Sequence, residues 1–153
     1  MIKLIVGLGN DGETYEHTRH NVGRFVVSTF PTQEEIVVSQ NSGFMNVCGS
    51  SVRRLVEKYG VAPEQVCVVH DDIAFDVGDY RLQFNRNANG HHGVESIISS
   101  FGTKGFWRMR VGIGSVPQGV DQSEFVLSKL TDIDEAHITK MCDAMWKSIQ
   151  TVT

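Results

Sequence analysis

Short apolar runs alternate with helix-like stretches along the whole chain, and this alternation limits the fold more than any other feature of the sequence. Strands are predicted at residues 3–7, 35–40, 66–69, 79–84 and 107–113, and helices at 21–29, 51–59, 94–101 and 132–149. Interleaved strands and helices indicate an α/β fold with a mixed, largely parallel sheet sandwiched between helices. A chain of 153 residues, 41% of them hydrophobic, is the size of one domain, so we expect a single domain over residues 1–153.

The composition argues against several classes of protein. No run of about eighteen apolar residues occurs, and the first residues enter strand-like sequence without a leader, so we expect a cytoplasmic protein with no membrane partner. Cys48, Cys67 and Cys142 are too scattered for a disulfide framework or a zinc pair and are interpreted as reduced core residues.

The charge is unevenly distributed. The whole chain carries a net charge of −4, which by itself argues against binding a polyanion. Residues 80–110, however, hold five basic side chains against Glu95 alone, a local charge of +4, with aromatic residues interleaved. This pattern suits contacts with nucleic-acid phosphates, and a solvated strand face is the alternative.

A glycine-rich turn, Gly7-Leu8-Gly9-Asn10-Asp11-Gly12, follows the first predicted strand. It has the spacing of a dinucleotide-binding motif, but the polar segment 13–21 that follows is not a packed helix start. We therefore interpret it as a tight turn that exposes Asn10. Ligands of open α/β sheets bind beyond the carboxyl ends of the strands, where this turn and the polar residues after 66–69 are both expected.

His20 and Asp71 are the candidates for general-base chemistry. Asp71 follows a buried apolar run, and a carboxylate there could orient His20 and stabilise its protonated form. The sequence has no Gly-x-Ser-x-Gly motif and no exposed cysteine context, so direct attack by a histidine-activated water is the simpler hydrolytic scheme. A plain surface histidine is the alternative for His20.

Two further clusters admit two interpretations each. Phe44-Met45-Asn46 either binds a ligand or caps the core before a helix. The histidines at 70, 91 and 92 with Asp71 and Asp72 could be drawn as a metal site, but their spacing matches no zinc motif, and we expect neither a metal nor a cofactor.

Several motifs, in order, resemble those of bacterial-type peptidyl-tRNA hydrolases. They are Lys3-Leu4-Ile5-Val6-Gly7-Leu8-Gly9-Asn10, Tyr15, Thr18-Arg19-His20-Asn21, Phe44-Met45-Asn46, Val68-Val69-His70-Asp71, Arg108-Met109-Arg110-Val111-Gly112-Ile113-Gly114 and Phe125-Val126-Leu127-Ser128-Lys129. The resemblance covers nearly the whole chain.

The resemblance implies a metal-free, monomeric enzyme that cleaves the ester between a peptide and the terminal ribose of transfer RNA. It implies His20 as the base, Asp71 as its partner, and Asn10 beside the scissile ester. It also implies substrate contacts at the acceptor end from Tyr15, Asn21, Phe44, Met45, Asn46, His91 and His92, and RNA contacts from Arg81 and Arg110.

The chain also departs from that family's pattern. Asp11 replaces the usual proline, which we expect to loosen the turn and to add negative charge beside a site for a polyanion. His92 replaces a substrate-binding asparagine, Asp72 stands where glutamate is usual, and the chain is shorter after residue 30 and at its end. These departures leave open a non-catalytic relative that binds RNA or protein, and a generic esterase is a third alternative.

Overall fold

The computed structural model of the chain describes residues 1–152. The strands are β1 (Leu4–Gly7), β2 (Val37–Gln40), β3 (Val66–Asp72), β4 (Tyr80–Phe84) and β5 (Trp107–Gly112). The α-helices are α1 (Val22–Ser28), α2 (Gly49–Tyr59), α3 (His92–Phe101), α4 (Gln122–Leu127) and α5 (Asp132–Thr151). Short 3-10 helices, η1 to η4, cover Glu13–Tyr15, Arg19–Asn21, Met45–Val47 and Pro63–Gln65.

Every strand and helix predicted from the sequence is present, and the differences lie at the ends and in one short helix. β3 continues through Asp72, so its last residues carry the polar cluster inside the strand. α3 begins at His92, two residues before the predicted start of this helix at residue 94. The six-residue helix α4 was not predicted because so short a segment shows no helical period; Asp121 caps it by accepting a hydrogen bond from the Ser123 amide.

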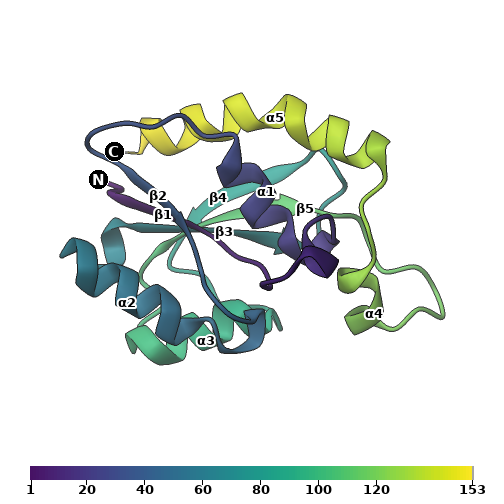
Figure 1. Cartoon of the computed structure of the whole chain (residues 1–153), viewed down its shortest axis with the longest axis horizontal. Helices are drawn as coiled ribbons and strands as arrows, with labels where there is room; N and C mark the ends of the chain where they lie inside the picture. Colours follow the sequence, from purple (N-terminus) through teal and green to yellow (C-terminus); the bar gives the residue numbers. More distant parts are fainter. Residues whose placement is uncertain (153) are drawn as a thin grey trace.

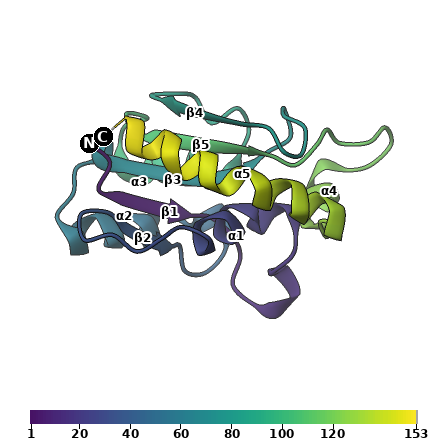
Figure 2. The ribbon, with the colours of Figure 1, turned by 90° about the horizontal axis from the view of Figure 1, so that it is seen from above.

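The five strands form one sheet in the order β2-β1-β3-β5-β4. All neighbouring pairs are parallel except β4 with β5, which is antiparallel. Helices α1 and α5 cover one face, and α2 and α3 cover the other (Figures 1 and 2). This single-domain α/β architecture confirms the predicted fold class.

The core is divided between the two faces of the sheet. Side chains alternate along each strand, so Leu4 and Val6 pack toward α2 and α3, whereas Ile5 packs toward α1 and α5. β3 is buried on both faces, as its continuous apolar sequence requires. Within the described residues, no helix is both long and apolar enough to cross a membrane.

Helix α1 lies directly against the sheet because of Gly23. A Cβ atom at Gly23 would lie 2.0 Å from the carbonyl oxygen of Val69 and 2.9 Å from the amide nitrogen of Leu8. Only glycine permits this approach. The close packing brings η2, which immediately precedes α1, to the carboxyl end of β3, where Asp71 lies.

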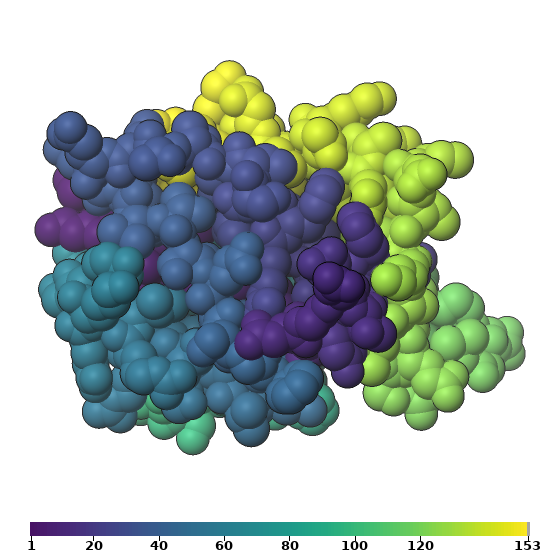
Figure 3. Space-filling model, viewed as in Figure 1, coloured from purple at the N-terminus to yellow at the C-terminus, as the bar shows by residue number. Residues whose placement is uncertain are grey.

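The segment between β1 and α1 also contacts the region of α4. Arg19 donates through Nη1 to Ser128 Oγ and the Lys129 carbonyl, and Thr18 forms an isolated β-bridge with Lys129. In the space-filling view, the purple segment abuts the yellow-green residues that follow α4, and the green loop at 114–121 projects beside them (Figure 3). The segment between β1 and α1 and the residues that follow α4 therefore lie side by side.

Candidate active site

A cavity of about 1160 Å³ opens at the carboxyl ends of β1 and β3. Its lining includes ten of the predicted site residues, namely Asn10, Tyr15, His20, Phe44, Met45, Asn46, Asp71, His91, His92 and Arg110. The structure therefore brings together residues from five separate segments of the sequence. Its position beyond the strand ends is the one expected for an open α/β sheet.

Two histidines share one buried carboxylate at the base of this cavity. Asp71 Oδ2 lies 2.8 Å from His20 Nδ1, and Asp71 Oδ1 lies 2.8 Å from His91 Nε2. The Asp71 side chain is only 3% exposed, and the two imidazole rings have centroids 5.3 Å apart. The predicted pairing of His20 with Asp71 is present, whereas the second histidine on the same carboxylate was not predicted.

The hydrogen bonds assign hydrogens on both rings. The Val94 amide donates to His91 Nδ1 at the start of α3, so Nε2 of His91 carries the hydrogen that is donated to Asp71. His20 uses Nδ1 toward Asp71, and Nε2 has no hydrogen-bond partner among residues 1–152. The lone pair of His20 Nε2 is therefore the one available to a substrate or a water in the cavity.

Asp71 and His20 shift each other's pKa in opposite directions. Burial raises the pKa of Asp71, but the nearby His91 and His20 lower it by more, so the pKa of this carboxyl lies well below its usual range. Burial lowers the pKa of His20, yet the charge of Asp71 and the hydrogen bond to it raise the pKa above 6.5. Asp71 is thus an anion that stabilises the protonated form of His20.

A third histidine lies behind this pair and is neutral. His70 is fully enclosed and donates through Nδ1 to the carbonyl oxygen of Asp71 at 2.8 Å. Burial, followed by the proximity of His91 and Arg108, lowers the pKa of His70 well below 6.5. His70 does not line the cavity, and its hydrogen bond holds the backbone of Asp71.

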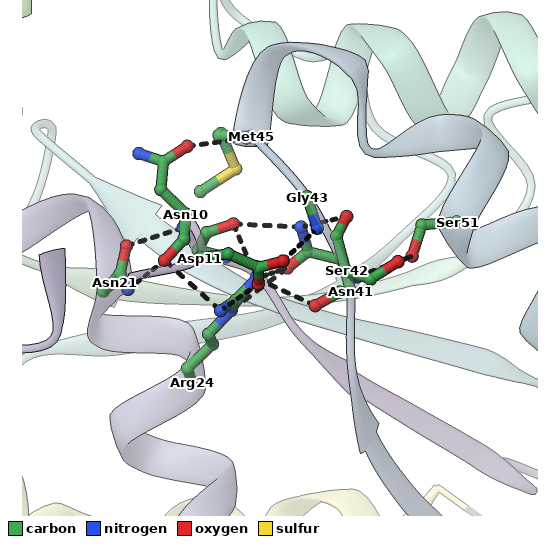
Figure 4. Close-up of polar contacts among 10 residues, drawn as sticks. Asn10, Asp11, Asn21, Arg24, Asn41, Ser42, Gly43, Met45 and Ser51 are labelled. Carbon is green, nitrogen blue, oxygen red and sulfur yellow. Dashed lines mark hydrogen bonds and ion pairs between the residues drawn. The ribbon is translucent and has the colours of Figure 1, made fainter. Parts of the chain in front are cut away.

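Asn10 presents a hydrogen-bond donor to the cavity. Its Oδ1 accepts a hydrogen bond of 2.7 Å from the Met45 amide, which orients the side chain (Figure 4). The opposite end of the carboxamide, Nδ2, has no partner within the described part of the chain, and Asn10 lines the cavity. An amide donor held in this way suits an oxygen that gains negative charge during a reaction.

Aromatic and apolar side chains form the outer part of the cavity. The rings of Tyr15 and Phe44 meet edge to face with centroids 6.3 Å apart, and Phe44 is 56% exposed. Val126 and Leu127 of α4 line the cavity as well. Such exposed apolar surface beside polar side chains is typical of a ligand-binding site.

Asn21 has a position different from the other predicted substrate contacts. It is buried and does not line the cavity. Its Oδ1 accepts from the Asn10 amide, and its Nδ2 donates to the Asn10 carbonyl. The structure therefore uses the Asn21 carboxamide to hold the backbone of Asn10.

The basic segment 80–110 is not one exposed surface. Arg108 is 1% exposed, and Arg110 is 8% exposed with its Nε 2.7 Å from Asp72 Oδ2 and its Nη1 2.8 Å from Gln83 Oε1. Phe106 lies in the core. Of the five basic side chains in this segment, only Arg81, Arg86 and Lys104 expose their charge, so surface contacts with phosphates are open to these three.

The two predicted RNA contacts, Arg81 and Arg110, thus differ in their surroundings. Arg81 is half exposed, stacks over Phe75 and is paired with Asp79. Arg110 lines the cavity but is bound to Asp72 and Gln83. Contact between Arg110 and a phosphate would require an exchange of these partners.

The expectation that Asp11 loosens the turn is wrong. The Asp11 amide donates to the Gly43 carbonyl, which proline could not do, and Asp11 Oδ2 accepts from the Gly43 amide at 2.6 Å. Asp11 Oδ1 also lies 2.9 Å from Arg24 Nη1, so its charge is balanced locally. The Gly43 amide and Arg24 lower the pKa of Asp11 accordingly.

Three side chains that line the cavity have ligand atoms close enough together to be considered as a metal site. They are His20, Asp71 and His91, with all ligand atoms within 4.8 Å of one another. The same atoms are paired at 2.8 Å by hydrogen bonds, which accounts for their proximity. The set considered from the sequence does not assemble, because His92 is at the surface beside Glu95 and Asp72 is bound to Arg110.

Arg24 and Asn41 were missed as residues that support the site. Arg24 lies in α1 and binds the backbone next to Asn10, and Asn41 follows β2 and binds Gly9. A charged residue within the small and apolar sequence of α1 was the available signal, since a buried charge needs partners. Its partners lie in other segments and carry no local pattern.

Known proteins are similar to this chain in both sequence and structure. The sequence model of the family described as peptidyl-tRNA hydrolase matches residues 4–43 and 28–153. The peptidyl-tRNA hydrolase of Aquifex aeolicus is 37% identical over 92% of this chain and 84% of its own length, and that of Desulfitobacterium hafniense is 34% identical over 99% and 91%.

A solved structure gives the same result at the level of the fold. The crystal structure of peptidyl-tRNA hydrolase from Acinetobacter baumannii superposes with a TM-score of 0.83 at 28% identity, covering 95% of this chain and 86% of that one. Sequence and fold therefore agree along almost the whole length, and the resemblance stated from the motifs is confirmed. The chain belongs to the peptidyl-tRNA hydrolase family.

Proposed function

We propose that this protein hydrolyses the ester bond between a peptide, or an N-blocked amino acid, and the 3′-terminal ribose of transfer RNA. The observation that carries the proposal is the pairing of His20 with buried Asp71 at the base of a cavity that Asn10 also lines. Membership of the peptidyl-tRNA hydrolase family supports the same reaction. No observation favours a non-catalytic role.

His20 acts as the general base in this scheme. Its Nε2 takes a proton from a water as the water oxygen attacks the ester carbonyl carbon. Asp71 keeps the hydrogen of the neutral ring on Nδ1 and stabilises the imidazolium that forms. Because His91 also donates to Asp71, the carboxylate is held from both sides and cannot swing away from His20.

The tetrahedral intermediate requires a donor for its oxyanion and a proton for its leaving group. Asn10 Nδ2 is the donor that we assign to the oxyanion, since Met45 already holds the other end of the carboxamide. Collapse of the intermediate breaks the bond between the carbonyl carbon and the ribose oxygen. The imidazolium of His20 returns its proton to that oxygen, which leaves a free 3′ end and a carboxylic acid.

The remaining side chains bind the substrate. Tyr15 and Phe44 offer aromatic surface to the terminal adenosine or to the first peptide residue. Met45, Asn46, His91 and His92 line the same cavity on the side of α3. Arg81, which exposes about half of its side chain, is the residue that we assign to an RNA phosphate, with Arg110 nearer to the cavity.

The test is the release of labelled N-acetyl amino acid from its transfer RNA. Replacement His20→Ala removes the base, so we expect kcat to fall by roughly 10²- to 10⁴-fold. His137→Ala is the matched control, because His137 is exposed on α5 and does not line the cavity. Equal release by the wild type and by His20→Ala would refute the proposed mechanism, and no release by the wild type would refute the function.

We further propose that the protein acts as a cytoplasmic monomer of one domain. The single sheet holds all five strands, and the cavity is complete within one chain. Light scattering of the purified protein tests the monomer directly. A dimer at the concentrations used for the assay would contradict this proposal without affecting the assignment of the reaction.

A further inference from the structure

We infer that Arg24 is a positioning residue that sets the carboxamide of Asn10 through the backbone on either side of it. This inference rests on the proposed function, in which Asn10 donates to the oxyanion. Arg24 does not line the cavity, so its effect on the reaction passes through Asn10. Figure 4 shows the network between the two residues.

The guanidinium of Arg24 binds two loops at once. Nη2 donates to the Gly9 carbonyl at 3.0 Å, and Nη1 donates to the Asn10 carbonyl at 3.3 Å. Nη2 also donates to the Asn41 carbonyl at 2.8 Å, and Nε donates to Asn41 Oδ1 at 3.3 Å. The side chain is 14% exposed, so these bonds are largely shielded from water.

Two asparagine side chains complete the attachment of this backbone. The Asn41 carboxamide accepts from the Gly9 amide and donates to the Gly9 carbonyl, both at 2.9 Å. The Asn21 carboxamide makes the equivalent pair of bonds with Asn10, at 2.8 and 3.0 Å. The backbone of residues 9 and 10 is therefore held at each amide and each carbonyl.

Gly9 provides the space that this arrangement needs. A Cβ atom there would lie 2.7 Å from Asn21 Cγ and 2.8 Å from Arg24 Cδ. Any other residue at this position would displace the side chains that hold the turn. The glycine of the motif is thus explained by the approach of two neighbouring side chains, and not by the approach of a nucleotide phosphate.

Asp11 extends the network to the segment that orients Asn10. It pairs with Arg24 Nη1 at 2.9 Å and accepts from the Gly43 amide at 2.6 Å. Gly43 precedes Met45 by two residues, and the Met45 amide donates to Asn10 Oδ1. Arg24 and Asp11 therefore fix both the backbone of Asn10 and the donor that sets the direction of its side chain.

Arginine suits this position better than lysine does. The planar guanidinium has five N–H donors and reaches several carbonyl oxygens together, whereas an ammonium is a point charge with no such fork. Loss of the guanidinium would leave the carbonyls of Gly9, Asn10 and Asn41 with fewer donors inside the fold. A shift of about 1 Å in Asn10 is enough to lower the rate about a hundredfold.

The first experiment compares Arg24→Ala with Arg53→Ala in the release assay. Arg53 is an exposed arginine of α2 whose ion pair with Glu57 lies outside the network, so it controls for the removal of an arginine. We expect Arg24→Ala to lower kcat by about 10- to 100-fold with KM changed less than about threefold. We expect Arg53→Ala to leave both constants unchanged. Unchanged kcat in Arg24→Ala would overturn the inference.

A double-mutant cycle tests whether the effect passes through Asn10. In the Asn10→Ala background, we expect Arg24→Ala to lower kcat less than about twofold further, because the group that it positions is absent. The same loss in both backgrounds would show that Arg24 supports the fold in general, and would overturn the inference. The wild-type rate is measured alongside, so an inactive wild type refutes the proposed function and not the positioning role.

A measurement that does not depend on activity tests the inference even if the wild type is inactive or if Arg24→Ala folds poorly. We expect the side-chain NH₂ resonances of Asn10, assigned by their loss in Asn10→Ala, to shift in Arg24→Lys and in Asp11→Ala and to stay in place in Arg53→Ala. Arg24→Lys should recover part of kcat because it keeps the charge opposite Asp11. Unmoved Asn10 resonances in both network variants would overturn the inference.

Discussion

The two walls of the cavity are held in different ways. One wall is the turn around Asn10. In this turn, the side chains of Asn21, Arg24 and Asn41 pair the backbone amides and carbonyls of residues 9 and 10. The other wall is the loop at 85–91, which is attached through His91 to Asp71 and through Arg108 to the carbonyls of Arg86 and Asn87. Both walls lie beside His20 and Asp71, and in the first wall side chains pair the backbone amide and carbonyl of both Gly9 and Asn10.

Unfavourable features lie behind the second wall, in strands β3 and β5. Arg108 Nε and His70 Nε2 are buried without a partner, and no carboxylate pairs with Arg108 in the part of the chain that the structure describes. Burial and the neighbouring Arg110 lower the pKa of Arg108 to about 10. Each unpaired buried polar atom costs roughly 1–3 kcal/mol.

The backbones of the two walls show the same contrast. The turn around Asn10 and the loop it binds have glycines, Gly12 and Gly43, where φ is positive. The loop at 85–91 places Asn85 and Asn89 at φ values of 60° and 51°, which side chains disfavour. The wall that carries Asn10, the proposed oxyanion donor, thus uses glycine at these positive φ values, whereas the loop that leads to His91 and His92 places two asparagines there.

Asp71 is common to both walls, so its replacement has the largest expected effect. In Asp71→Asn we expect kcat to fall by roughly 10²- to 10⁴-fold, because His20 loses the anion that stabilises its protonated form. The charge of Asp71 and the hydrogen bond to it raise the pKa of His20. In the proposed mechanism, activity rises with pH as His20 loses its proton. The acid limb of the pH–rate profile should therefore move to lower pH in Asp71→Asn.

The control for this prediction is Asp143→Asn, since Asp143 is an exposed residue of α5 paired with Lys147. It should keep both the rate and the limb of the wild type. An acid limb in Asp71→Asn at the same pH as in the wild type would show that another group titrates, and the assignment of the limb to His20 would be lost.

The second prediction compares Arg24 and Arg108 by their effect on stability. We expect Arg24→Met to lower the free energy of unfolding by about 2–3 kcal/mol, because several carbonyls and Asp11 lose a charged donor. We expect Arg108→Met to lower it by less than about 1 kcal/mol, because the change also removes a buried charge without a carboxylate partner. Urea unfolding of both variants measures the difference, and equal losses would break the contrast between the walls.

The smallest expected effect concerns the strained backbone of the second wall. Asn85→Ala should lower the free energy of unfolding by about 1 kcal/mol, since alanine disfavours a positive φ more than asparagine does. Asn85→Gly should stay within about 0.5 kcal/mol of the wild type because glycine accepts this conformation. Thermal unfolding resolves the pair, and a loss in Asn85→Gly as large as in Asn85→Ala would assign the effect to the asparagine side chain.

Much of the site could be predicted from the sequence because strand ends are readable. The apolar run before Asp71 and the turn containing Asn10 placed both residues at the carboxyl edge of one sheet. Ordered motifs then connected His20 with Asp71, which lie 2.8 Å apart between Nδ1 and Oδ2. The roles of the individual side chains in substrate binding stay predictions.

Other features could not be predicted because they depend on partners that are distant along the chain. Arg110 was predicted to contact RNA within a basic segment, but β5 lies between β3 and β4, and the Arg110 guanidinium binds Asp72 and Gln83. Asp11 was expected to loosen its turn, yet Arg24 and Gly43 hold it. The charge count of a segment does not show which of its charges are paired.

The sequence by itself determined the order of strands and helices, the layered α/β fold and the family of this protein, because periodicity, turn residues and motifs are local. Only the tertiary structure decided that His20 and His91 share Asp71 and that Arg24 binds the turn of Asn10. These contacts follow from the register of the sheet and from the close packing of α1 at Gly23, neither of which is encoded in a single segment.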